Sequence, residues 1–287
     1  MPAPLLFVLS GLTQYVGAAL AVGVFGTIAA ASVAWLRIAV AAVVLVGWRR
    51  PWRSRWERAD LRTAVGFGVV LALMNVAFYI AIDHLPLGTA VAIEFLGPVG
   101  VAAATGRGWR DRVGIAVAAL GVVLLAGVSL DTGPGAVIGL VAIGVSAACW
   151  AAYILLGRRV ARAGTGGITG LSVAMAAGAI VFAPFLAGGA APVLHDARLA
   201  ALVVGIAVLS SVIPYALEQV VLRRVRAATF AVLLAMLPAT AAVVGAVALQ
   251  QVPHGLEIVG LLLVSAAIVL TGLDREDTPL DAAPPPA

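Results

Sequence analysis

Two charged residues stand inside long apolar runs of the sequence. Glu94 lies between His84 and Pro98, and Arg37 lies in the run 30–48. A charged side chain at the centre of a bilayer costs roughly 2.5 to 3.5 kcal/mol on the insertion scale, so both must face protein or water. Glu94 is interpreted as a proton-coupling group or as the partner of a substrate ammonium group. The alternative is a structural partner for a donor on another helix, such as Arg37.

Arg37 has two interpretations of equal weight. Its guanidinium can bind a substrate carboxylate through two parallel hydrogen bonds. It can instead neutralise Glu94, or cap carbonyl groups that are freed at a kink. An amino-acid substrate carries both charges, so an Arg–Glu pair could exchange partners with it.

Three uncharged polar residues also fall at span depth, namely Gln14, Tyr15 and Asn75. They can line a cavity and bind substrate, or they can join helices, since such bonds contribute only about 0.5 to 2 kcal/mol in membranes. We favour cavity lining for Gln14 and Asn75. Tyr215, which aligns with Asn75 in the repeat described below, is a similar candidate.

Glu218 lies near the end of the run 199–221, close to Arg223 and Arg224. An ion pair at the helix end is the favoured interpretation, and a role in an inner gate is the alternative.

Three prolines are expected to bend their helices, because proline has no backbone N–H and leaves one carbonyl without its helical partner. The carbonyls that lose their helical partner are those of residues 94, 210 and 234, four residues before Pro98, Pro214 and Pro238. A hinge function at these sites is a hypothesis. Small residues are expected to allow close helix packing; they are Gly66, Gly68, Gly97, Gly100, Gly135 and Gly139.

The composition identifies an integral membrane protein. Of 287 residues, 63% are hydrophobic and 11% are charged, and the mean hydropathy is +1.12. Such a chain has too few polar residues to cover a soluble surface. The apolar runs are long enough for helical spans and unlike the short alternating strands of a barrel.

Ten apolar runs alternate with short loops, and the loops indicate the topology. The runs are 5–23, 30–48, 63–82, 87–104, 112–129, 135–156, 167–187, 199–221, 228–249 and 255–272. All 18 basic residues are arginine, and they gather after the even-numbered runs. Positive loops mark the cytoplasmic side, so both termini are expected inside.

The two halves of the chain repeat one pattern. A shift of 140 residues aligns Thr89 with Thr229 and Pro98 with Pro238. We therefore expect two five-helix units, a first unit over 1–129 and a second unit over 135–272, followed by a disordered cytoplasmic tail over 273–287. Because five is odd, the second unit must enter the membrane from the opposite side, which makes the repeat inverted and favours a transporter. Glu94 aligns with Leu234 and Pro214 with Met74, so the carboxylate and the extra kink each occur in one unit only.

Four stretches of the sequence resemble a known family. The run Gly88–Pro98 (GTAVAIEFLGP), the stretch QYVGAA from Gln14, LRIA from Leu36 and SVIPYALE from Ser211 are similar to bacterial threonine/homoserine exporters of the EamA group of the drug/metabolite transporter superfamily. The resemblance implies a ten-helix inner-membrane carrier that exports amino acids or related metabolites. One departure is Gln250-Gln251, where the family commonly has Gly-Glu.

The resulting prediction is a proton-coupled secondary transporter, an antiporter that works by alternating access in the bacterial inner membrane. The same scaffold with another cargo, such as an aromatic amino acid, a purine or a cationic drug, is the alternative. No Walker A motif, His/Cys metal pattern or catalytic constellation is present, so we expect neither an enzyme nor a cofactor or metal. The expected partners are a small-molecule substrate, protons and the bilayer, with no nucleic acid; a homodimer is an open alternative to a monomer.

Overall fold

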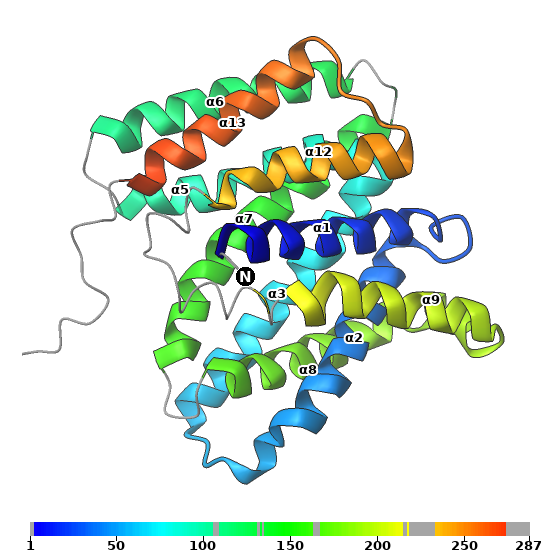
Figure 1. Ribbon diagram of the computed structural model, residues 1–287. Helices are drawn as coiled ribbons and strands as arrows, with labels where there is room; N and C mark the ends of the chain where they lie inside the picture. Colours follow the sequence, from blue (N-terminus) through cyan, green and yellow to red (C-terminus); the bar gives the residue numbers. More distant parts are fainter. Residues whose placement is uncertain are drawn as a thin grey trace, which may run out of the picture.

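A computed structural model of the chain describes residues 3–105, 109–130, 133, 135–162, 167–214, 217 and 233–273, and all regular structure within these ranges is helical (Figure 1). The long helices are α1 (Ala3–Val22), α2 (Ala30–Arg49), α3 (Arg58–His84), α6 (Trp109–Leu130), α7 (Gly135–Arg162) and α8 (Gly167–Leu186). The shorter ones are η1 (Pro51–Arg53), α4 (Leu87–Glu94), α5 (Leu96–Thr105), η2 (Gly188–Leu194), α9 (Ala197–Ala207), η3 (Val208–Val212), α12 (Met236–Leu249) and α13 (Leu256–Leu273).

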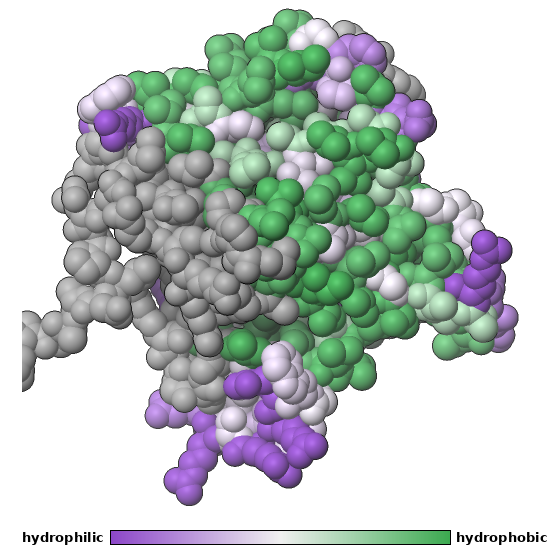
Figure 2. All heavy atoms as spheres, viewed as in Figure 1, coloured by the Kyte–Doolittle hydropathy of each residue, from purple (hydrophilic) through white to green (hydrophobic). Residues whose placement is uncertain are grey.

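The helices are those of a multi-pass membrane protein. Six helices in the described ranges are long and apolar enough to cross a membrane. The number is seven if the segments 188–194 and 197–212, between which the chain bends by 115°, form one span. Large apolar side chains such as Val43, Phe185 and Val247 are more than 70% exposed. Figure 2 shows apolar residues over much of the visible surface and hydrophilic residues at its margins. A surface of this kind is stable only against lipid.

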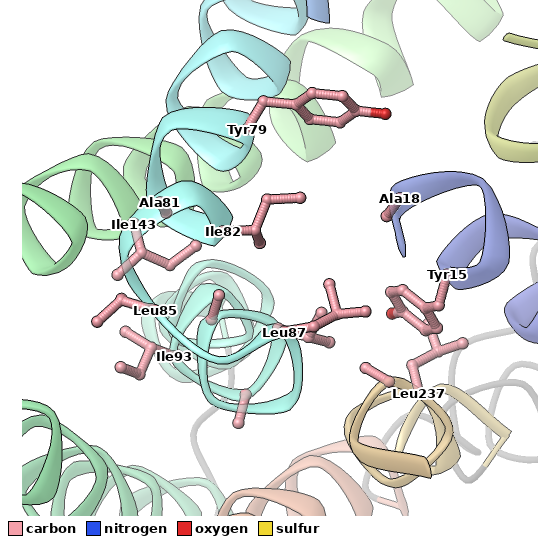
Figure 3. Close-up of a cluster of buried hydrophobic side chains, with 14 of the residues drawn as sticks. Tyr15, Ala18, Tyr79, Ala81, Ile82, Leu85, Leu87, Ile93, Ile143 and Leu237 are labelled. Atoms are coloured by element: carbon pink, nitrogen blue, oxygen red, sulfur yellow. The ribbon is translucent and has the colours of Figure 1, made fainter. Parts of the chain in front are cut away.

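The main helix contacts join the part of the chain before residue 130 to the part after it. The pairs are α3 with α7, α6 with α13, α2 and α3 with α8, and α1 and α4 with α12. In Figure 1, α6 and α13 lie side by side at one edge. The buried core follows these contacts: Tyr15, Leu87 and Leu237, from α1, α4 and α12, belong to one hydrophobic cluster (Figure 3).

The apolar run 87–104 does not form one continuous helix. α4 ends at Glu94, Phe95 forms a turn, and α5 begins at Leu96. The break falls where Pro98 cannot donate a hydrogen bond to the carbonyl of Glu94. The same pattern precedes Pro238, because Ala235 forms a turn and α12 begins at Met236.

A different irregularity precedes Pro214. Residues 208–212 form the π-helix η3, in which the N–H of Ile213 donates to the carbonyl of Val208. A proline ring clashes with the carbonyl four residues earlier, and a π-turn is a common way for a helix to absorb such a disruption. The equivalent part of α3, around Met74, is a continuous α-helix.

Two glycines allow backbones to touch across the molecule. A Cβ at Gly68 of α3 would lie 2.0 Å from the carbonyl oxygen of Ala174 on α8, and a Cβ at Gly97 of α5 would lie 2.3 Å from that of Ala147 on α7. The expectation of close packing is wrong for Gly66 and Gly100, because a Cβ at either would meet no atom within 4 Å.

Candidate functional site

Arg37 is a buried cation on α2, only 9% exposed. Its guanidinium donates to the hydroxyl of Tyr79 at 3.2 Å and to Oδ1 of Asn75, both on α3. The guanidinium carbon also lies 5.1 Å from the centre of the Tyr79 ring, within the range of a cation–π contact. Its Nε is buried and has no hydrogen-bond partner among the residues that the structure describes.

The two α3 partners are held in place by helical geometry. Asn75 and Tyr79 are four residues apart on α3, so they share one face of the helix. The Asn75 side chain donates from Nδ2 to the carbonyl of Leu71 at 2.7 Å, which turns its Oδ1 toward Arg37. Both partners are neutral, so the positive charge is solvated by dipoles without being cancelled.

Glu94 is half-buried at the last residue of α4, next to the break at Phe95. Its Oε1 lies 2.5 Å from the hydroxyl oxygen of Ser146 on α7. The same hydroxyl lies 2.9 Å from the carbonyl oxygen of Met74 on α3. Ser146 is fully buried, whereas Glu94 is half-buried.

One face of α7 packs against the break. The Trp150 ring meets the Phe95 ring edge-on, with centroids 4.7 Å apart and planes at 61°. One turn earlier, the carbonyl of Ala147 approaches Gly97, and this close approach brings Ser146 to Glu94. Side chains spaced four apart on α7 therefore hold the interrupted span.

Arg37 and Glu94 do not form an ion pair in the described structure, since Glu94 is bonded to Ser146 and Arg37 to Asn75 and Tyr79. The sequence left open whether Arg37 and Glu94 pair; in this conformation the donor from another helix that contacts Glu94 is Ser146. The two groups nonetheless lie within electrostatic range of each other. Met74 and Asn75 are adjacent on α3, so this helix connects the two charged residues.

The other predicted residues lie apart from these contacts or outside the described ranges. Gln14 is half-buried on α1. Tyr15 is 3% exposed and packs in the cluster of Figure 3. Tyr215 and Glu218 lie outside the described residues.

Tyr79 and Ser146 were not predicted from the sequence. Tyr79 had a signal, because it follows Asn75 by four residues and so shares its face. Ser146 had none, because a serine among the small residues of an apolar run resembles any residue that permits close packing.

A separate cavity of ≈ 210 Å³ lies at the ends of α4, α12 and α13. Its lining includes Thr89, Gln250, Gln251, His254 and Glu257, and does not include Arg37 or Glu94. Gln251 closes one side, as its Oε1 accepts from the backbone N–H of Leu87 at 2.9 Å. No cluster of three metal-ligating side chains occurs among the described residues.

A bundle of apolar spans with an interrupted helix and uncancelled buried charges has the properties of a membrane transporter. Residues 137–273 match the EamA-like transporter family. The chain is 36% identical over 257 residues to the threonine/homoserine exporter RhtA of Salmonella typhimurium and 35% identical over 251 residues to that of Escherichia coli K12, covering 88% of this chain and 84% of each relative. The chain belongs to the EamA-like transporter family. A solved crystal structure that is 17% identical shares the fold, with a TM-score of 0.59 over 96% of this chain and 99% of the other.

Proposed function

We propose that this protein is a secondary transporter that exports amino acids of the threonine/homoserine kind, or related small metabolites, in exchange for protons. The observation that carries the proposal is the pair of buried ionisable groups that are not bonded to each other. Within the described part of the chain, the hydrogen-bond partners of Arg37 are neutral, and Glu94 is held by the neutral hydroxyl of Ser146.

An amino-acid zwitterion is complementary to these two groups. Its carboxylate is the counter-charge that Arg37 lacks, and the unpartnered Nε of Arg37 is a donor that such a ligand can use. Its ammonium group is the counter-charge for Glu94. Transport requires that substrate can leave, and the neutral partners on α3 and α7 keep each charge solvated after release.

Proton exchange follows if the Glu94 carboxylate binds either a proton or the substrate ammonium group. Glu94 cannot hold a proton and stabilise a substrate ammonium group at the same time, because protonation removes its charge. Each release of substrate then favours uptake of a proton, which is the requirement for antiport. An ionisable group within a span is a candidate proton relay for this reason.

We propose further that ten spans form two inverted five-helix units, over 1–129 and 135–272, which move against each other. Three observations support this. The helix breaks at Phe95 and Ala235 are 140 residues apart. Carbonyls at the equivalent positions Met74 and Pro214 each accept from a serine hydroxyl of the other unit, at 2.9 Å and 3.4 Å. The family match over 137–273 also covers almost the same residues as the second unit.

The interruptions next to Pro98 and Pro238, and the π-turn before Pro214, are the proposed hinges. Breaks in spanning helices near an ionisable residue are typical of transporter binding sites. The location proposed is the bacterial inner membrane, with both termini cytoplasmic, because the arginine-rich loops follow even-numbered spans.

The test is transport by the purified full-length chain in liposomes loaded with labelled threonine or homoserine. Acidifying the outside should accelerate efflux, and a protonophore should abolish the acceleration. Efflux no faster than from loaded vesicles without the protein would refute the proposal for these substrates. Competition by an aromatic amino acid, a purine or a cationic drug, with no effect of threonine, would favour the alternative cargo.

A further inference from the structure

We infer that Ser146 is a positioning residue that transmits the protonation state of Glu94 to helix α3. The inference rests on the proposed role of Glu94 in proton exchange. It comes from the number of hydrogens available at one buried contact, where the hydroxyl oxygen of Ser146 lies 2.5 Å from Oε1 of Glu94 and 2.9 Å from the carbonyl oxygen of Met74.

A serine hydroxyl has one hydrogen to donate, and a backbone carbonyl can only accept. An ionised carboxylate can also only accept. When Glu94 is ionised, two acceptors therefore compete for the single hydrogen of Ser146. The carboxylate wins, because hydrogen bonds to an ionised group are roughly twice as strong as neutral ones. Met74 then loses its bond to α7.

Protonation of Glu94 removes the competition. The carboxylic acid donates to the oxygen of Ser146, and the hydrogen of Ser146 turns to the carbonyl of Met74. Both contacts are then satisfied, and α4, α7 and α3 are joined in one chain of hydrogen bonds. The hydroxyl thus changes its direction with the charge of Glu94 while the heavy atoms stay in place.

The hydrogen bond from Ser146 to the carbonyl of Met74 affects the helix that binds Arg37. Met74 precedes Asn75, which accepts from Arg37, and α3 also carries Tyr79, the second partner of Arg37. The α3–α7 contact also joins the segments before and after residue 130. Proton binding at Glu94 therefore adds a bond between the two segments on the helix that orients the buried cation.

Among the described residues, few other titratable groups face Glu94. They include Arg37 of α2 and the thiol of Cys149 on α7. Helix α12 carries no titratable side chain, and those of α6 and α13 lie near helix ends, at Arg110, Asp111, Arg112 and Glu257. The titratable side chains at the ends of α3 and α7 are likewise far along the helix from Met74 and Ser146.

The sequence allows a direct test, because the chain has only four methionines and Met74 is one of them. The full-length protein labelled with carbonyl-¹³C methionine is titrated in lipid by infrared spectroscopy, and Met74→Leu identifies the Met74 band. The carboxylic-acid band that Glu94→Gln removes reports the protonation of Glu94. In the unmodified chain the Met74 band should shift together with the Glu94 band.

The shift should be lost in Ser146→Ala and in Glu94→Gln. Ser32→Ala is the matched control, because the Ser32 hydroxyl also donates to a carbonyl on another helix, Leu186 at 3.0 Å, and should leave the shift unchanged. A Met74 band that stays fixed while Glu94 titrates, or that shifts equally in Ser146→Ala, would overturn the inference. If Ser146→Ala does not fold, the comparison with Glu94→Gln still decides.

The titration needs no substrate, so it separates this inference from the proposed function. A chain that moves no threonine but shows the coupled shift contradicts only the function. In liposomes, Ser146→Ala should lose the acceleration of threonine efflux by a pH gradient. Acceleration equal to that of the unmodified chain would count against Ser146 as the transmitter.

Discussion

Replacing Gly97 by alanine should separate α5 from α7 and break the contact between Ser146 and Glu94. The new Cβ would lie 2.3 Å from the carbonyl oxygen of Ala147, whereas ordinary contact begins at 3.4 Å. The helices must therefore part by roughly 1 Å, because the carbonyl of Ala147 belongs to the backbone and cannot rotate away. The 2.5 Å contact of Ser146 with Glu94 would lengthen to roughly 3.5 Å, beyond hydrogen-bond range.

The expected cost is about 1 to 3 kcal/mol of unfolding free energy, the usual range for overpacking. Gly100→Ala is the matched control on the same helix, because its Cβ would meet nothing within 4 Å. Alanine has a higher helix propensity than glycine by about 1 kcal/mol, so the control should be neutral or stabilising. Thermal unfolding in detergent, followed by circular dichroism, measures both. Equal stability of the two variants, with efflux still accelerated by acid in Gly97→Ala, would refute the reasoning.

Three further substitutions test individual residues. Arg37→Lys keeps the charge and loses the planar fork, so we expect threonine to bind roughly 10-fold to 100-fold more weakly, measured as a rise in KM for exchange; an unchanged KM would place substrate elsewhere. Glu94→Gln should weaken threonine exchange at equal pH, because the amide cannot neutralise the substrate ammonium group. It should also lose acceleration by a pH gradient, because the amide does not titrate; an unchanged pH response in the liposome assay would leave Glu94 only a structural role. Gln250→Gly should raise the free energy of unfolding by about 1 kcal/mol. Gln250 ends α12 in the left-handed conformation, with φ of 58°, which is unfavourable for a residue that has a Cβ. A thermal unfolding temperature that does not rise would contradict this.

The sequence predicted the membrane class and the family because both depend on features that are local or cumulative. Apolar runs reflect the length of a span, and the GTAVAIEFLGP run identifies the family without any knowledge of contacts. Pro98 was expected to disturb its helix, and the helix is interrupted at Phe95. The nature of the disturbance was not predictable, since Pro98 coincides with a break and Pro214 with a π-turn. Neighbouring helices decide how freed backbone groups are satisfied.

The partners of the two charged residues were also beyond the sequence. A pairing of Arg37 with Glu94 was one of the alternatives that the sequence left open, and each is bonded to a neutral side chain on another helix. Which face of α2 meets α3, and which face of α7 meets α4, depends on helix rotation. In helices that are apolar on all sides, no polar stripe marks that rotation.

The glycine contacts have a consequence for motion. The close approaches at Gly17, Gly68, Gly88, Gly97 and Gly121 all join the segment before residue 130 to the segment after it. Side chains that interlock as ridges and grooves must climb over one another when helices slide. A seam where backbone faces backbone has few such obstacles. At these five positions, therefore, a displacement of one segment along the other would meet fewer steric obstacles than at a contact between large side chains.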